Sequence, residues 1–108
     1  MKLIAVHTTV ASLQEARNIA RALVERRLVA CAQIAEVESF YGWEGALQNE
    51  REFRLLLNTT DAQYMAVQAA IRALHSYQLP AIYAVALEHV DQAYADWVEQ
   101  CSDGAKAG

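Results

Sequence analysis

The fold is decided by residues 3–15, which read LIAVHTTVASLQE. The first four of these residues are aliphatic and predict a buried strand that ends at residues 7–9. Ser12 and Glu15 have the spacing of a capping box, in which each side chain satisfies a free amide at the start of a helix. This stretch therefore predicts a strand followed by a helix. The apolar stripe of that helix is formed by Ala16, Ile19, Ala20 and Leu23.

The middle of the chain predicts two strands joined as a hairpin. Residues 30–41 are rich in β-branched and aromatic types and predict a long, partly exposed strand. Residues 52–57, which read EFRLLL, predict the next strand. Gly42 and Gly45 flank Trp43 after the first of these strands, so the segment between the strands is expected to form the hairpin tip.

The rest of the chain repeats the first pattern. Thr60 and Gln63 have capping-box spacing before a second apolar helical stripe, which ends near His75. Residues 81–87 alternate large and small apolar side chains and predict a strand. A last helix is expected to begin near Asp91. Its buried stripe is predicted to contain Tyr94, Trp97, Val98 and Cys101.

The predicted order is strand, helix, strand, strand, helix, strand, with an additional terminal helix. This order is typical of an α+β ferredoxin-like split βαβ sandwich. A chain of 108 residues is long enough for one core and too short for two, so residues 1–101 are expected to form a single domain. Residues 102–108 are small and polar and are predicted to be a disordered tail.

Composition and charge argue against a membrane or a nucleic acid as partner. The uninterrupted apolar runs are a few residues long, far below the roughly 20 that cross a bilayer, and the N-terminus lacks the features of a secretory signal. We therefore expect a cytoplasmic protein. Nine lysines and arginines are scattered among thirteen acidic residues, for a net charge of −4, so no basic surface for a phosphate backbone is predicted.

The sequence lacks catalytic motifs, and it lacks the motifs of several protein families that commonly have this fold. Cys31 and Cys101 have no second cysteine nearby, so each is predicted to be a reduced, buried thiol and not part of a zinc knuckle or redox pair. The chain has no metallochaperone CxxC, no glycine-aromatic strand for RNA and no glycine-rich anion cradle after the first strand. GxSxG, Walker, HExxH and EF-hand patterns are also absent, so we predict neither an enzyme nor an organic cofactor.

Two histidines are expected at neighbouring strand ends. In a split βαβ sandwich, right-handed crossovers bring the end of the first strand beside the start of the fourth. His7 ends the first strand and His75 precedes the fourth, so the pair predicts a two-histidine metal site within one subunit. Structural zinc usually takes four ligands, so this pair alone is incomplete. The alternative for His75 is a histidine that caps the C-terminal end of its helix.

Cys31 begins the second predicted strand, at the opposite edge of the sheet. A strand from Cys31 to Tyr41 spans on the order of 30 Å, so one subunit is not expected to share a metal between Cys31 and His75. Only an oligomer would bring copies of these two residues together. The alternative for Cys31 is a small core residue.

Tyr41 and Trp43 are predicted to lie on the hairpin tip, where a small domain does not easily bury them. Exposed aromatic side chains usually mark an interface, so we expect these two in contacts between chains. The alternative, a platform on which bases stack, is disfavoured by the acidic charge of the chain.

Several short fragments, taken in order along the chain, carry a resemblance to a known family. Any one fragment is unspecific, but the ordered set, which runs from about Leu3 to Trp97, resembles the CutA divalent-cation-tolerance proteins. These fragments are Ala30, Cys31, residues 39–41, residues 43–45, Glu52, residues 55–57, Thr59, His75, Tyr77, Pro80, Tyr94 and Trp97.

The resemblance implies a ferredoxin-like subunit in a stable homotrimer, with an architecture similar to that of PII signalling proteins. Tyr41 and Trp43 would then belong to trimer contacts. The family is linked to copper and other divalent metals, and the resemblance implies ligands near Cys31, near His75 and at the end of the first strand.

This chain departs from the family pattern in the loop after His75. Where the family usually reads His-Pro-Tyr-Glu-x-Pro-Glu, residues 75–81 read HSYQLPA, so two carboxylates are missing. Asn58 replaces a usual lysine and Gln33 a usual asparagine. Hard cations are therefore not expected at this loop. His7 lies where some members carry a cysteine, which favours a soft or borderline metal such as copper or zinc.

The sequence thus predicts a trimeric, cytoplasmic, CutA-like protein that takes part in the response to metal ions. The predicted metal ligands are His7, His75 and Cys31, and the metal is copper or another divalent ion such as zinc. No protein partner beyond the homotrimer is identified. The alternative is a PII-like trimeric signalling scaffold that binds a small ligand or a partner protein between subunits.

Overall fold

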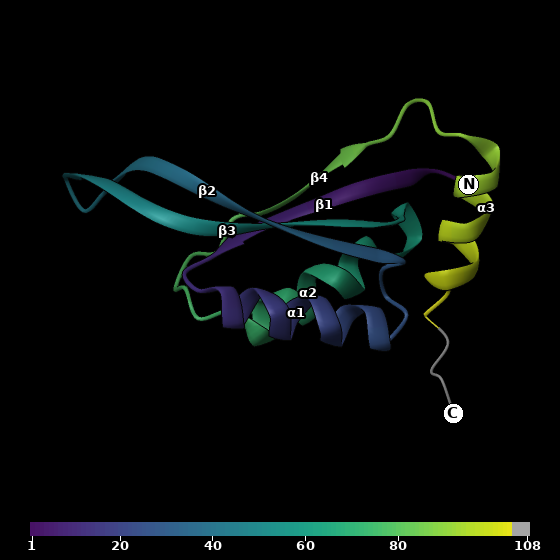
Figure 1. Cartoon of the computed structure of the whole chain (residues 1–108), viewed down its shortest axis with the longest axis horizontal. Coiled ribbons are helices and arrows are strands. Elements are labelled where there is room, and N and C mark those ends of the chain that lie inside the picture. The colour runs from purple at the N-terminus through teal and green to yellow at the C-terminus, as the bar shows by residue number, and fades with distance from the viewer. Residues whose placement is uncertain (105–108) are drawn as a thin grey trace.

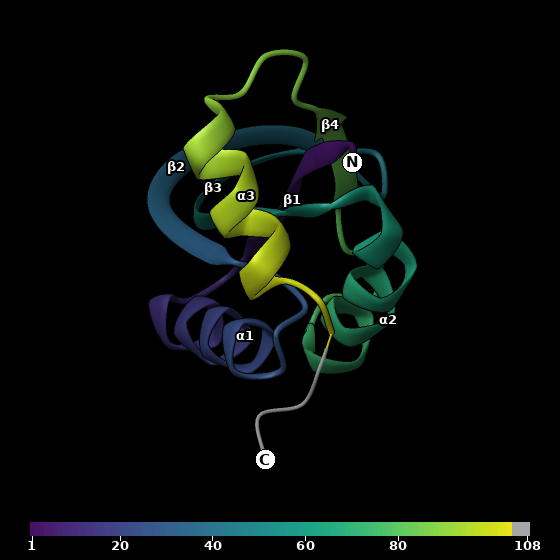
Figure 2. The ribbon, with the colours of Figure 1, turned by 90° about the vertical axis from the view of Figure 1, so that its right-hand side faces the viewer.

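A four-stranded antiparallel sheet organises the computed structural model, which describes residues 1–104 (Figure 1). The strands lie in the order β2-β3-β1-β4. Helices α1 and α2 lie side by side on one face of the sheet, and α3 crosses its end near the start of β1 (Figure 2). This α+β arrangement confirms the predicted ferredoxin-like split βαβ sandwich. The elements are β1 (Leu3–Val10), α1 (Leu13–Glu25), β2 (Cys31–Trp43), β3 (Ala46–Thr60), the 3₁₀ turn η1 (Asp61–Gln63), α2 (Tyr64–Leu74), β4 (Ile82–Ala86) and α3 (Gln92–Cys101).

The two predicted capping boxes have different outcomes. Ser12 caps α1, and its hydroxyl accepts a hydrogen bond from the Glu15 amide at 3.1 Å. Thr60 makes no side-chain cap bond, and a 3₁₀ turn precedes α2. The second prediction is wrong because Thr60 is still the last residue of β3 and pairs with Leu3 of β1. Membership in the sheet overrides the local pattern.

The hairpin is longer than the sequence predicts, and its turn is tighter. β3 begins at Ala46, and only Glu44 and Gly45 join it to β2. Both turn residues have positive φ, 50° and 80°, which is the requirement of a two-residue type I′ turn. Gly42, expected at the tip, lies within β2 and pairs with Leu47. The hairpin projects beyond the rest of the sheet, so residues 46–51 have no core to face and show no apolar alternation (Figure 1).

The main core lies between the sheet and the helices α1 and α2. Alternate strand residues enter it because successive side chains point to opposite faces of a sheet. A smaller cluster lies under α3, where Val98 packs with Leu3 and Ala30. The fully buried residues of the main core include Val6, Val10, Ile19, Leu23, Leu55, Leu57 and Ile71.

The C-terminal part of the chain corrects two expectations. Of the predicted buried stripe of α3, only Val98 is fully buried, while Tyr94 and Trp97 are exposed. Ser102, expected in a disordered tail, is buried, and the Gly104 amide donates to the Arg27 carbonyl at 2.9 Å. Residues 102–104 are therefore part of the folded domain. The remainder of the predicted tail, residues 105–108, lies outside the described residues.

The sheet face opposite α1 and α2 is called the open face below. Cross-strand partners share a face, so the register places His7, Cys31 and Glu52 here, with Tyr83 and Val85 of β4. Tyr83 and Val85 are exposed. Within residues 1–104, no helix has the length and apolarity that crossing a membrane requires.

Candidate functional site

His7, predicted at the end of the first strand, lies in the middle of β1, because pairing with β3 continues to Val10. It lies between Leu56 of β3 and Tyr83 of β4. Its ring stacks on Tyr83 with the ring centroids 5.0 Å apart and the planes 4° from parallel. Its Nδ1 is buried and has no hydrogen-bond partner within the described residues. Burial, and secondly the positive charge of Arg54, lower the pKa of His7. His7 is therefore neutral at neutral pH, which is the form that ligates metals.

His75 follows α2, and its side chain is fully buried. Its Nε2 lies 2.8 Å from the Thr9 carbonyl oxygen, and its Nδ1 lies 3.1 Å from the Tyr77 amide nitrogen. A carbonyl only accepts and an amide only donates, so these partners assign the neutral tautomer with the proton on Nε2. Both ring nitrogens are thus engaged, and the imidazole connects the loop to β1. A metal would have to displace one of these bonds.

The two predicted strand ends are neighbours, but the two histidine side chains have different partners. β1 and β4 pair with Thr8 opposite Ile82, as the crossover rule predicts. His7, however, stacks on Tyr83, while His75 bonds to the backbone at Thr9. In residues 1–104 no group of three or more His, Cys, Asp or Glu side chains is arranged to hold a metal ion. The ligand set of His7, His75 and Cys31 therefore remains a prediction.

Cys31 begins β2 and is partly exposed. It pairs with Asn58 of β3, and β2 and β4 form opposite edges of the sheet, as expected. Cys31 and His7 share the open face. Their strands are separated by β3, and His7 lies two residues further along the strand direction than the position level with Cys31. Ordinary strand spacings place their Cα atoms about 12 Å apart. The Nδ2 of Asn58 donates to the Tyr94 hydroxyl at 2.9 Å, which holds α3 close to this end of the face.

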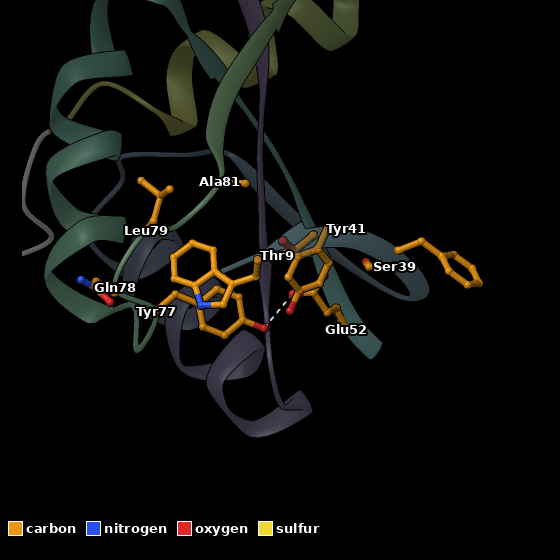
Figure 3. Close-up of a pocket in the computed structure, with 10 residues that line it drawn as sticks. Thr9, Ser39, Tyr41, Glu52, Tyr77, Gln78, Leu79 and Ala81 are labelled. Carbon is orange, nitrogen blue, oxygen red and sulfur yellow. Dashed lines mark hydrogen bonds between the residues drawn. The ribbon is translucent and has the colours of Figure 1, made fainter. Parts of the chain in front are cut away.

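A groove of about 660 Å³ lies where the hairpin faces the loop between α2 and β4 (Figure 3). Glu52 of β3 lines the groove and is 6% exposed. The Tyr77 hydroxyl points at Glu52 and donates to its carboxylate at 2.7 Å. The lining residues are Thr9, Ser39, Phe40, Tyr41, Trp43, Glu52, Tyr77, Gln78, Leu79 and Ala81.

The electrostatics of the groove are dominated by carboxylates. Burial, followed by the hydrogen bond to Glu52, raises the pKa of Tyr77. The hydrogen bond that Tyr41 donates to Glu50 is the first cause that raises the pKa of Tyr41 to about 12. Both phenols therefore keep their protons at physiological pH and act as donors to the carboxylates.

The loop that forms one wall of the groove is fixed by Glu15 of α1. The Glu15 carboxylate accepts hydrogen bonds from the amide of Ser76 at 2.8 Å and from its hydroxyl at 3.0 Å. Glu15 also lies 3.7 Å from Nδ1 of His75. The capping-box glutamate predicted from sequence thus uses its side chain on a distant loop instead of on its own helix.

Sequence reasoning did not identify Glu52, Glu15 and Ser76 as site residues. For Glu52 the signal was its place among the residues that carry the family resemblance, since charged residues also stand on both sides of it in the strand. The sequence pattern assigned Glu15 to the local capping box, so its contact with the distant Ser76 was not predicted. Tyr41 and Trp43, predicted at an interface, are exposed and line the groove, and their contact with another chain remains a prediction.

Comparisons with known proteins agree on one family. Residues 4–101 match the model of the CutA1 divalent ion tolerance protein. The chain is 34% identical over 95 residues to the divalent-cation tolerance protein CutA of Archaeoglobus fulgidus, covering 88% of this chain and 93% of that protein. It is 38% identical over 93 residues to the protein of the same description from Thermus thermophilus, covering 85% and 90%.

Solved structures of CutA proteins share the fold. The structure of the Thermus thermophilus protein superposes with a TM-score of 0.89 at 36% identity, covering 93% of this chain and 98% of that one. The Archaeoglobus fulgidus structure, described as a periplasmic divalent cation tolerance protein, superposes with a TM-score of 0.91 at 32% identity, covering 93% and 98%.

Proposed function

Because this chain belongs to the CutA1 divalent ion tolerance family, we propose that it serves metal tolerance as a non-catalytic, cytoplasmic homotrimer that binds copper or zinc. The observation that supports metal binding is the state of the His7 side chain. Its imidazole is neutral, half-buried on the open face, and has an unpartnered Nδ1 in the part of the chain that the structure describes. Imidazole is a suitable ligand for both copper and zinc.

The metal site is proposed to be completed between subunits. His7 and Cys31 share the open face but lie about 12 Å apart. Bonds from zinc to nitrogen and sulfur are about 2.0–2.3 Å long, so one ion does not bridge these two side chains of a single chain. Copies of these two residues from neighbouring subunits would supply the remaining ligands. His75 would become a ligand after release of its hydrogen bond to Thr9 or Tyr77.

Two features of the sheet favour assembly. β2 and β4 are edge strands, so each leaves one row of backbone groups without a partner strand within the described residues. These edges differ from each other, and unlike edges associate head to tail, an arrangement that forms a closed ring when the rotation between subunits closes. The open face also exposes Tyr83 and Val85, and the hairpin exposes Tyr41 and Trp43.

The metal proposal is tested by titrating untagged protein with Cu²⁺ and with Zn²⁺ in a calorimeter. We expect His7→Ala and Cys31→Ser each to weaken binding at least about tenfold, since even the loss of a residue that only supports a metal ligand typically has an effect of this size. His89→Ala is the matched control, because His89 is almost fully exposed on the loop after β4. Unchanged binding in a His7→Ala, His75→Ala double variant would refute the proposal. Light scattering during gel filtration tests the trimer, which is refuted by a mass other than three chains.

The groove supports a second candidate function, a trimeric signalling scaffold that recognises a small ligand. A concave site with aromatic walls and one buried charged group is typical of small-molecule sites. This function is tested by equilibrium binding to the purified trimer in the absence of metal. It requires neither His7 nor Cys31.

A further inference from the structure

Glu52 is a buried carboxylate without a counter-charge within the described residues. It is 6% exposed, and in residues 1–104 no lysine, arginine or histidine nitrogen lies within 4.0 Å of its oxygens. Its one side-chain partner in that range is the neutral Tyr77 hydroxyl, at 2.7 Å. Arg54, two residues further along β3, lies instead where it acts on His7. A buried charge is unfavourable unless it is paired, so Glu52 lacks the partner that its position requires.

Two other carboxylates in residues 1–104 show the contrast with Glu52. Glu36 forms an ion pair with Arg51 at 3.0 Å, and both are exposed on the hairpin. Glu15 receives two hydrogen bonds from Ser76. Glu52 is distinguished because it combines deep burial with a position at the wall of a groove.

The walls around Glu52 are aromatic. Tyr41 and Trp43 reach the groove from the hairpin, and Tyr77 reaches it from the opposite loop. Aromatic faces attract ammonium and guanidinium groups through the ring quadrupole, most strongly when the cation is desolvated. The apolar side chain of Leu79 lines the same groove and is exposed to it. The groove therefore offers one negative charge, several ring faces and an apolar surface.

We propose that this groove binds an organic cation, with a primary ammonium group on the Glu52 carboxylate and its carbon chain against Trp43, Tyr77 and Leu79. This inference specifies the ligand of the scaffold function proposed above and is independent of metal binding at His7. The raised pKa of Tyr41, about 12, and that of Tyr77 agree with a negative potential in the groove, because both arise in part from Glu50 and Glu52.

A small anion is disfavoured by that same potential. A divalent cation is also a poorer fit, because Mg²⁺ and Ca²⁺ take six or more oxygen ligands and most of this lining is carbon. In the part of the chain that the structure describes, no set of three metal-ligating side chains surrounds Glu52. An ammonium group needs only one carboxylate and the ring faces.

The test uses butylammonium as the probe, with 1-butanol as the uncharged analogue and butyrate as the anionic one. Binding to the metal-free full chain is followed by NMR through the indole N–H signal of Trp43, which Trp97→Phe distinguishes from the second tryptophan. We expect butylammonium to shift the Trp43 signal saturably, and 1-butanol and butyrate to bind at least tenfold more weakly. Glu52→Gln keeps the acceptor for Tyr77 and is expected to weaken butylammonium binding about tenfold or more, since hydrogen bonds to charged groups are the strong ones.

The matched control is Glu25→Gln, which makes the same change in net charge at an exposed position at the end of α1. It is expected to bind as the parent does. Equal binding of butylammonium and 1-butanol, or full binding by a folded Glu52→Gln variant, overturns the proposal. If butylammonium has no effect but butyrate or 1-butanol shifts Trp43 saturably, the cation inference fails while the scaffold function stands. If none of the three shifts Trp43, both fail.

Discussion

The Tyr77 hydroxyl donates a 2.7 Å hydrogen bond to the Glu52 carboxylate, which connects the loop between α2 and β4 to the middle of β3. The two residues are separated by 25 positions in sequence. The bond gives a buried charge its one side-chain donor within the described residues and sets the position of an aromatic wall of the groove. Loop conformation and site geometry therefore depend on the same contact.

Removing this hydroxyl is expected to destabilise the fold. Tyr77→Phe leaves the buried Glu52 carboxylate without its donor, so the free energy of unfolding should fall by about 2 kcal/mol. Urea denaturation at fixed protein concentration measures the change. Tyr83→Phe is the matched control, because the Tyr83 hydroxyl makes no hydrogen bond within residues 1–104. A loss no larger than that of the control would show that the bond contributes little.

His7 is expected to make stability depend on acid pH. Its pKa is lowered in the folded chain, so below the ordinary value of 6.5 the unfolded chain binds more protons than the folded one. The contribution of His7 to the free energy of unfolding is fully present above pH 6.5 and is lost as the pH falls towards the folded-state pKa. His7→Gln should lose less stability than the parent between pH 7 and pH 5, measured by urea denaturation. His89→Gln should behave as the parent does, and a similar effect of both variants would contradict the assignment.

The hairpin turn is expected to depend on Gly45. Its φ of 80° is unfavourable for a residue with a Cβ, so Gly45→Ala should cost roughly 1 kcal/mol of unfolding free energy. Gly42→Ala is the control, because Gly42 lies within β2 without a positive φ. An added Cβ meets no atom within 4 Å at either position, so the comparison isolates backbone conformation. Equal effects in thermal unfolding would contradict this explanation.

Glu15 is expected to control local opening of the loop after α2. Glu15→Ala removes the acceptor of both hydrogen bonds from Ser76, so the Ser76 amide should exchange its hydrogen about tenfold faster. Hydrogen exchange followed by NMR measures this rate. Glu25→Ala, at the other end of α1, should leave it unchanged. Unaltered exchange at Ser76 in Glu15→Ala would show that other contacts hold the loop.

Local signals predicted most of the fold. The period of apolar residues located the strands and helices, and Ser12 marked the start of α1 as expected. The same pattern failed at Thr60, because pairing with Leu3 keeps that residue in the sheet. The outer half of the hairpin was missed as well, since residues beyond the core carry no alternation of apolar and polar side chains.

The candidate site was predicted only in part. The crossover rule placed the end of β1 beside the start of β4, and the structure confirms this neighbourhood. The crossover rule could not show that the two ring nitrogens of His75 form hydrogen bonds with the backbone of Thr9 and Tyr77. Nor could it show that Nδ1 of His7 has no hydrogen-bond partner within the described residues. Those facts depend on side-chain direction, which a strand order does not specify.

The sequence by itself determined the order of strands and helices, the ferredoxin-like topology and the family, because periodicity, caps and characteristic residues are local properties of the chain. Only the tertiary structure decided that Glu15 holds Ser76 and that Tyr77 meets a buried Glu52. The first contact joins residues that are 61 positions apart in the sequence, and the second joins residues that are 25 positions apart. Their energies arise from burial and hydrogen-bond geometry, which exist only after the elements have packed together.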